Sequence, residues 1–186
     1  TVANHLAING VTAPDTHVVT TAAEHPSVLA TVEQMTDHSI LSVGVDGRVS
    51  LPSVANSLTD KTSLVSVLWG NNETGVLQDI EAIGRLCRDR NVLFHVDGVQ
   101  AFGRLSFRVV DLPIDMMTVS GHKVYGPQGV GALWVRTGVS LVPTLSGGHQ
   151  ERGRRAGTEN VAAIAGMGAA CERLPVLLAE QERVCQ

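Results

Sequence analysis

A lysine between an apolar segment and a glycine-rich turn is the first candidate for chemistry in this sequence. Lys123 lies in the stretch SGHKVYGPQG (residues 120–129), and an apolar segment, residues 115–119, leads into it. Lysine attacks carbonyl groups only as the free amine, so a reactive lysine must be partly desolvated or lie near positive charge. The alternative is an ordinary loop lysine on a Gly/Pro turn, and this stretch alone does not decide between the two.

A carboxylate at the end of a second apolar segment favours the reactive interpretation. Asp97 follows the apolar part of the stretch NVLFHVDGVQ (residues 91–100). In open α/β sheets, ligands bind at the carboxyl ends of the strands. An aspartate there can pair with a protonated ring nitrogen, a partner that pyridoxal phosphate needs, whereas the commoner role of an aspartate after a strand is a helix N-cap. Lysine after one strand and aspartate after another is more specific than either residue alone.

Together with further motifs, these residues resemble the large domain of the NifS/IscS-type cysteine desulfurases and the related selenocysteine lyases. The motifs run in the family's order: Glu24-His25, NNETG (71–75), HVD (95–97) with Gln100, SGHK (120–123), GGHQERG (147–153) and RAGTEN (155–160). The family belongs to the class V aminotransferase group. The resemblance implies an α/β fold, the large domain of a fold-type I enzyme that depends on pyridoxal 5'-phosphate.

The resemblance also implies a role for each residue around the cofactor ring. Lys123 would form the covalent bond to the cofactor aldehyde and later carry a proton at the substrate carbon. Asp97 would pair with the ring nitrogen. His25 would stack on the ring and take part in proton transfer, a role that suits histidine because the unperturbed imidazole pKa is about 6.5. Gln100 and Asn72 would hydrogen-bond the ring hydroxyl.

The cofactor phosphate needs hydrogen-bond donors. The family pattern gives this role to Ser120 and His122, just before the lysine, and to Thr1, where a helix N-terminus would add backbone N–H groups. Thr158 resembles a residue that reaches the phosphate from the other subunit, so the site would be complete only in a homodimer.

Several of these residues have structural alternatives. His25 precedes Pro26 and could cap a helix. Asn72 lies in an Asn-Glu-Thr triplet, which also matches an N-glycosylation sequon. His95 is expected to face away from the side chain of Asp97 and to be structural. Cys87 and Cys171 are expected to lie in the core.

The implied reaction removes sulfur from L-cysteine, giving L-alanine and an enzyme-bound persulfide for transfer to an acceptor protein, as in iron–sulfur cluster assembly. In the family, the cysteine that takes the sulfur lies beyond residue 186, and neither Cys171 nor Cys185 sits in a matching motif. The alternatives are a selenocysteine lyase, another class V lyase or aminotransferase, and a cofactor-binding or dimerisation fragment without activity. Val2 and His5 depart from residues that are common in the family.

Composition limits the class of protein. The net charge is −4 and the isoelectric point is about 5.9, which argues against a general nucleic-acid binder. No run of about 18 apolar residues predicts a membrane span, and no metal-ligand spacing is present. The odd number of cysteines, with no CxxC, favours a reducing compartment: the cytoplasm, or the mitochondrion in a eukaryote.

Strand-like and helix-like segments alternate, which predicts a mostly parallel mixed sheet with helices on both faces. Strands are expected at 17–21, 40–43, 63–69, 93–96, 116–120 and 130–135, and helices at 4–9, 26–35, 53–58, 78–90 and 161–183, the last interrupted at Pro175. We expect a single domain over residues 1–186, without the family's N-terminal arm and small C-terminal domain. Such a fragment is expected to be inactive by itself.

Overall fold

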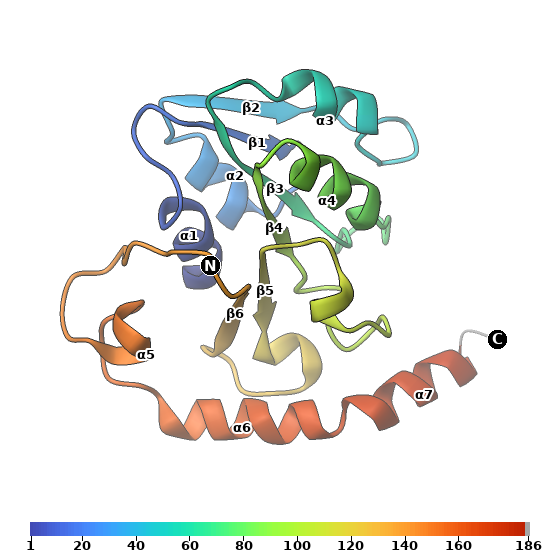
Figure 1. The fold of residues 1–186 in the computed structure, drawn as a ribbon. Coiled ribbons are helices and arrows are strands. Elements are labelled where there is room, and N and C mark those ends of the chain that lie inside the picture. The colour runs from blue at the N-terminus through green and yellow to red at the C-terminus, as the bar shows by residue number, and fades with distance from the viewer. Residues whose placement is uncertain (185–186) are drawn as a thin grey trace.

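Six strands form one mixed sheet in the computed structural model, which describes residues 1–184 (Figure 1). They are β1 (His17–Thr21), β2 (Asp37–Leu41), β3 (Thr62–Leu68), β4 (Leu93–Asp97), β5 (Met116–Ser120) and β6 (Gly131–Val135). The strand order is β2-β1-β3-β4-β5-β6. Strands β1 to β5 run parallel, and β6 pairs antiparallel with β5. The predicted mostly parallel mixed sheet is therefore confirmed.

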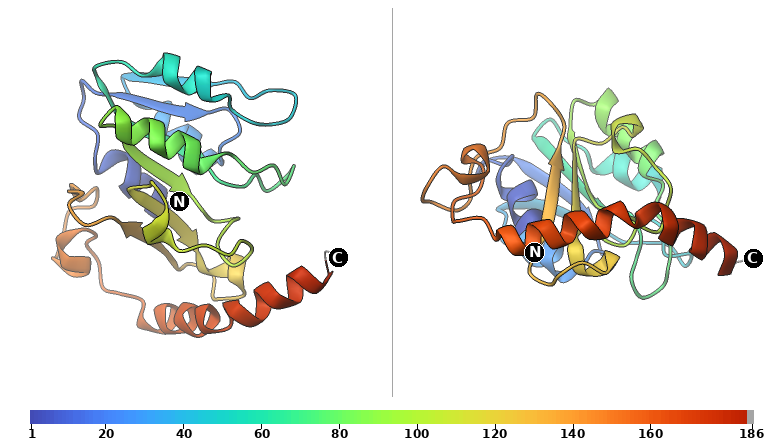
Figure 2. Two further views of the ribbon diagram at one scale, coloured as in Figure 1. Left: turned by 45° about the vertical axis from the view of Figure 1, so that its right-hand side comes forward. Right: turned by 90° about the horizontal axis from the view of Figure 1, so that it is seen from below.

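Helices cover both faces of this sheet and so make three layers (Figures 1 and 2). The helices are α1 (Val2–Asn9), α2 (Pro26–Val32), α3 (Leu51–Ser57), α4 (Ile80–Asp89), α5 (Gln150–Gly153), α6 (Val161–Glu172) and α7 (Leu174–Val184). Two 3₁₀ turns, η1 (Val109–Asp111) and η2 (Gly121–Val124), flank β5. Helix α6 packs on η2, at the end of the molecule that Figure 2 shows from below.

Side-chain alternation along the strands divides the core in two, because successive strand residues point to opposite faces. On the face under α1 and α2 the buried apolar residues are Ala7, Ile8, Val18, Val28, Val32, Leu64 and Met116. The other face packs against α3 and α4, with Val65, Val67, Phe94, Val96 and Met117 from the strands. Asp97 and His95 alternate with Val96 and Phe94, so they lie on the α1/α2 face.

Helices α3 and α4 begin at residues whose side chains cap them. Asp79 caps α4 by accepting a hydrogen bond from the N–H of Ala82 at 3.0 Å, and Ser50 caps α3 through the N–H of Ser53 at 3.1 Å. Such caps each contribute ~1 kcal/mol. Helix α4 also approaches the crossover before β5 closely, because a Cβ on Gly84 would clash with the carbonyl oxygen of Pro113. Glycine at this position therefore sets the helix-to-crossover distance.

Predicted and observed elements differ mainly at their ends. Strands 17–21 and 116–120 are confirmed, but β2 begins three residues earlier than expected. The polar start of β2 is explained by its parallel pairing with β1 at the sheet edge, from His17↔Asp37 onward. Helix α2 ends at Val32 instead of residue 35, and α6 and α7 are separate helices, as the proline at 175 indicated.

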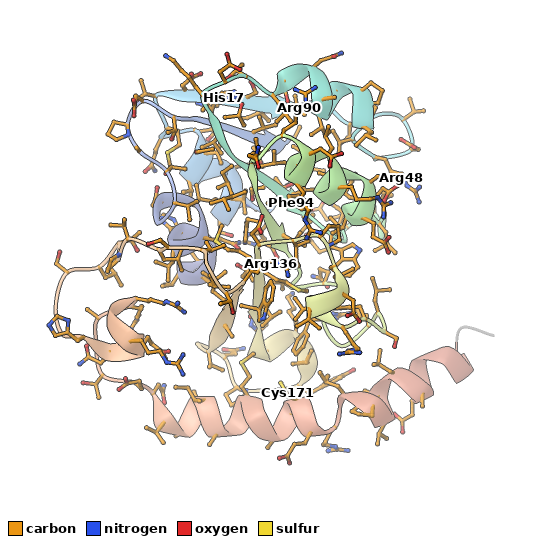
Figure 3. The ribbon with its side chains drawn as sticks, viewed as in Figure 1. His17, Arg48, Arg90, Phe94, Arg136 and Cys171 are labelled. Carbon is orange, nitrogen blue, oxygen red and sulfur yellow. The ribbon has the colours of Figure 1, made fainter. Side chains whose placement is uncertain are left out.

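Polar side chains fasten strands and loops at several points (Figure 3). His17 bonds Thr62 on β3 at 2.8 Å and Ser39 on β2 at 2.9 Å. Arg136, just after β6, donates to the carbonyl oxygens of Ile114 at 2.7 Å and Leu112 at 2.6 Å. Arg136 thus holds the crossover before β5 to the end of the β5–β6 pair.

Within residues 1–184 no single helix has the length and apolarity to cross a membrane, and α6 with α7 pass that test only as a pair bent by 46°.

Candidate functional site

The carboxyl ends of β4 and β5 bring the predicted aspartate and lysine to the same edge of the sheet. Asp97 is in register with Thr118, and the N–H of Gly98 donates to the Thr118 carbonyl at 3.0 Å. Beyond β5 the chain turns at once into η2, which carries Lys123. The turn closes at Tyr125, whose φ of 64° lies in the left-handed region. Parallel strands explain this proximity, since their carboxyl ends share one edge.

Lys123 is half-buried in this turn. Among the described residues, no hydrogen bond or ion pair engages its amine. The amine is therefore not occupied by a carboxylate and is available to a ligand at this edge of the sheet.

Asp97 is 2% exposed, and its hydrogen bonds within the described part of the chain come from neutral donors. Its Oδ2 accepts from Nδ2 of Asn4 at 2.8 Å, and its Oδ1 accepts from the N–H of Val99 at 3.1 Å. Within the part of the chain that the structure describes, no cationic side chain pairs with it. A buried carboxylate without a counter-charge is costly. The protonated ring nitrogen of pyridoxal phosphate would supply that charge, so this site fits the cofactor.

His25 forms the N-cap of α2, which is the structural alternative that its position before Pro26 indicated. Its Nδ1 accepts from the N–H of Ser27 at 3.1 Å and lies 2.8 Å from the Ser27 hydroxyl. The residue is nevertheless exposed, and the cap engages only Nδ1. The ring face and Nε2 are not occupied by the cap, so capping and ligand contact are compatible.

Glu24 lies beside His25 and is 6% exposed. Its Oε1 accepts from the Thr21 hydroxyl at 2.7 Å and from the N–H of Leu68 at 2.8 Å, while its Oε2 is buried without a partner among the described residues. Burial raises the pKa of Glu24 to about 8, against the two hydrogen bonds, which lower it. The nearby carboxylate of Asp97 raises it further. Glu24 is therefore mostly protonated at neutral pH.

The turn after β3 carries the NNETG motif. Asn71 organises it: its Oδ1 accepts from the N–H groups of Glu73 and Thr74, both at 2.9 Å, and its Nδ2 donates to the Ala23 carbonyl at 3.1 Å. This last bond fastens the turn beside the segment that leads to His25. Asn72 is exposed at the tip of the turn.

Gln100, the second residue predicted to contact the ring hydroxyl, follows the same edge. It is half-buried, and a Cβ on Gly70, where the Asn-Asn turn begins, would lie 3.6 Å from its Cβ. The structure therefore places the Gln100 backbone next to the base of the turn that carries Asn72.

Two of the predicted phosphate contacts interact directly. The Ser120 hydroxyl lies 2.9 Å from Nδ1 of His122. Thr1 is the N-cap residue of α1, and its side chain forms no cap bond. Helix α1 packs along β5 and β6.

Thr158 lies on the exposed segment between β6 and α6, and no hydrogen bond among the described residues joins it to the other predicted site residues. In this segment Glu151 and Arg152 have φ of 50° and 60°, and Gln150 Oε1 accepts from the N–H of Gly157 at 3.0 Å. Because the predicted role of Thr158 is in the partner subunit, that role stays a prediction.

His95 was expected to face away from Asp97, and that expectation was wrong. Residues two apart on a strand point to the same face, and only immediate neighbours alternate. His95 is fully buried, with Nδ1 2.9 Å from the Ser66 hydroxyl and Nε2 3.0 Å from the Thr118 hydroxyl. Burial lowers the pKa of His95 to about 4 in spite of the opposing effect of Asp97, so the ring is neutral at physiological pH.

Sequence reasoning missed Asn4, the direct partner of Asp97. Asn4 is 2% exposed and lies in α1 beside the buried Ala7 and Ile8. A polar residue on the apolar side of a helix is the available signal, because a buried amide must find hydrogen-bond partners.

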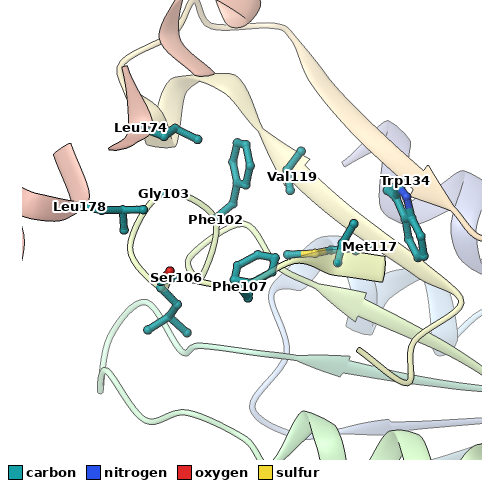
Figure 4. A pocket seen from close by; sticks show the side chains of 11 residues that line it. Phe102, Gly103, Ser106, Phe107, Met117, Val119, Trp134, Leu174 and Leu178 are labelled. Carbon is teal, nitrogen blue, oxygen red and sulfur yellow. The ribbon is translucent and has the colours of Figure 1, made fainter. Parts of the chain in front are cut away.

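An apolar cavity of about 360 Å³ lies elsewhere (Figure 4). Its walls include Phe102, Phe107, Met117, Trp134 and Leu174. Met117 points to the α3/α4 face, whereas Asp97 and His95 lie on the other face. The cavity is thus separate from the predicted site.

A mostly parallel α/β sheet with a lysine and a buried aspartate at one edge is the architecture expected of the large domain of a fold-type I enzyme. The chain belongs to the aminotransferase class V family, whose pattern matches residues 1–182. It is 48% identical over 160 residues to a cysteine desulfurase of Nostoc sp., covering 84% of this chain and 40% of that protein.

Solved structures agree with this assignment. The NifS-like protein from Rickettsia africae superposes with a TM-score of 0.89 at 36% identity, covering 96% of this chain and 50% of that one. The structure of SspA in complex with cysteine gives 0.87 at 39% identity, covering 91% and 52%. The predicted resemblance and fold class are confirmed. The chain spans less than half the length of the Nostoc relative and about half of the solved structures.

Proposed function

We propose that this chain forms the cofactor-binding part of a cysteine desulfurase that uses pyridoxal 5'-phosphate. One observation carries the proposal: Asp97 is a buried carboxylate that no cationic side chain of the described residues pairs, at the sheet edge where Lys123 lies. When bound, the cofactor supplies an electron sink for cleavage of the Cα–H bond of an amino acid. The names of the relatives and the bound cysteine in the SspA structure support cysteine as the substrate.

Each residue around the cofactor has its own role in this proposal. Asp97 holds the positive charge at the ring nitrogen, and Lys123 binds the cofactor covalently and then moves a proton at the substrate carbon. His25 lies against the ring face, Asn72 and Gln100 bond the ring hydroxyl, and the phosphate is bound by Thr1, Ser120, His122 and the partner's copy of Thr158. Proton transfer by such positioned groups contributes ~10²–10⁴ in rate.

Sulfur leaves the substrate side chain as L-alanine forms and is taken by a thiolate. Cys87 is unsuited to that role, because burial raises its pKa to about 12 and the thiol rather than the thiolate then prevails. Burial also raises the pKa of Cys171. Cys185 lies outside the described residues. We assign the acceptor thiol to no described cysteine of this chain and propose transfer of the sulfur to an acceptor protein.

The decisive experiment uses the two lysines of the sequence, Lys123 and Lys61. The full-length protein is loaded with pyridoxal phosphate, reduced with borohydride, digested and mapped by mass spectrometry. The label is expected on Lys123, and Lys123→Ala is expected to abolish it together with release of alanine from cysteine. Lys61→Ala, at an exposed position before β3, is the matched control. Label on Lys61 or none in the wild type would refute cofactor binding at this site.

The products distinguish the alternative reactions. Alanine with sulfide or a persulfide indicates a desulfurase, and a stronger response to selenocysteine with selenide release indicates a selenocysteine lyase. A 2-oxo acid product would instead indicate an aminotransferase.

A further inference from the structure

Four side chains from three elements form one continuous hydrogen-bonded chain at the site. Asn4 Nδ2 lies 2.8 Å from Oδ2 of Asp97 on β4 and 2.9 Å from the hydroxyl of Ser27 on α2. That hydroxyl lies 2.8 Å from Nδ1 of His25. Asn4 and Asp97 are 2% exposed and Ser27 is 9% exposed, so the chain is shielded from water up to the imidazole.

The direction of each bond follows from the chemistry of the groups. A carboxylate oxygen accepts, so Asn4 turns its amide nitrogen toward Asp97, and its Oδ1 is left buried without a partner among residues 1–184. The second amide proton goes to the Ser27 oxygen. The Ser27 hydroxyl then donates its own proton to Nδ1 of His25, which also accepts from the Ser27 backbone N–H at 3.1 Å. With Nδ1 accepting, the neutral ring carries its proton on Nε2.

We propose that Asn4 and Ser27 are positioning residues that hold Asp97 and His25 as one unit. Asn4 fixes the plane of the carboxylate, and through Ser27 it sets the orientation and tautomer of His25, which then offers an N–H from Nε2 toward a ligand. The effect on the cofactor rests on the proposed function, whereas the effect on the His25 ring does not.

The first test needs no cofactor. Long-range ¹H–¹⁵N spectra of the full-length protein, stripped of cofactor, report which ring nitrogen of His25 carries the proton. We expect the Nε2–H tautomer in the wild type. In Asn4→Ala the His25 nitrogen signals are expected to move, although no hydrogen bond joins Asn4 to the ring. Asn9→Ala on the same helix is the control and is expected to leave them in place. Unchanged His25 signals in Asn4→Ala would overturn the proposal. If that variant does not fold, Asn4→Leu, of similar shape, replaces it.

The second test is a double-mutant cycle on the dissociation constant for pyridoxal phosphate. Losing one hydrogen bond to a charged group predicts about tenfold to a hundredfold weaker binding for Asn4→Ala. Ser27→Ala is expected to weaken binding as well, and the double variant to bind no worse than Asn4→Ala. Ser53→Ala on α3 serves as the control. Additive losses would contradict a connected unit, and wild-type affinity in Asn4→Ala would do the same. Absence of binding by the wild type would refute the proposed function and leave the first test to decide this proposal.

Discussion

Glu24 makes the free energy of unfolding depend on pH, and the substitution Glu24→Gln isolates its contribution. The side chain is 6% exposed, and burial raises its pKa from 4.5 to about 8. At neutral pH it is a carboxylic acid whose Oε1 accepts two hydrogen bonds, so the buried Oε2 carries the proton. Glu24→Gln keeps an acceptor for Thr21 and Leu68 but removes the titration.

The direction in which pH changes the free energy of unfolding follows from proton binding in the folded and unfolded states. Between pH 4.5 and about 8 the folded protein holds a proton on Glu24 that the unfolded chain has released. Stability from this group is therefore complete below pH 4.5 and is lost as the pH rises through about 8. Each pKa unit corresponds to ~1.4 kcal/mol, so the full interval amounts to at most about 5 kcal/mol.

Urea unfolding at a series of pH values from about 6.5 to about 9.5, above the range in which His95 titrates, measures this effect. Tryptophan fluorescence is the signal, because Trp69 follows Leu68 directly. The free energy of unfolding of the wild type is expected to fall over this range, and that of Glu24→Gln to stay nearly level. Glu73→Gln, at an exposed turn position, should follow the wild type. Parallel curves for Glu24→Gln and the wild type would refute the assignment of a protonated Glu24.

Four further substitutions test other features of the fold. His95→Gln in the Glu24→Gln background is expected to remove a loss of stability of ~3 kcal/mol that occurs as the pH falls from 6.5 to about 4, because burial lowers the pKa of His95 and the unfolded chain then binds the extra proton; urea unfolding between pH 6.5 and about 4 checks it. Gly84→Ala is expected to cost ~1–3 kcal/mol by overpacking against the Pro113 carbonyl, whereas Gly168→Ala in α6, where a Cβ meets nothing within 4 Å, should gain ~0.5–1 kcal/mol; thermal unfolding that ranks them the other way would contradict the packing. Tyr125→Gly is expected to stabilise by ~1 kcal/mol, because it relieves a left-handed φ of 64°, and a lower midpoint of unfolding would show that the ring makes compensating contacts.

Much of this fold could be predicted because the local residue pattern and the place of each segment in the sheet favour the same secondary structure. Residues 17–21 and 116–120 are short segments whose residue types favour strands, and the structure confirms their bounds. The start of β2 could not be predicted, since Asp37 and His38 become strand only through pairing with β1. Parallel pairing is a long-range property that a polar segment does not encode by itself.

The residues of the candidate site likewise fall into those that the local sequence identifies and those that it does not. Lys123 and Asp97 could be identified from residue type and from their places after strands. The partner of Asp97 could not, because Asn4 comes from a helix 93 residues away, and no local motif links the two. The face of His95 is a different case, because period-two alternation places His95 and Asp97 on the same side of the strand and the sequence alone could have shown it.

The long reach of the Asn4–Asp97 bond has a consequence for folding. Lys123 lies between β5 and β6, which pair antiparallel as near neighbours in sequence, so its turn can form by local contacts. Asp97 gains its Asn4 partner only when α1 docks across 93 residues, and closing such a loop carries a higher entropic cost and slows formation of the contact. We therefore expect the lysine turn to form early and the environment of the aspartate to form last, so that the complete site arises at the end of folding.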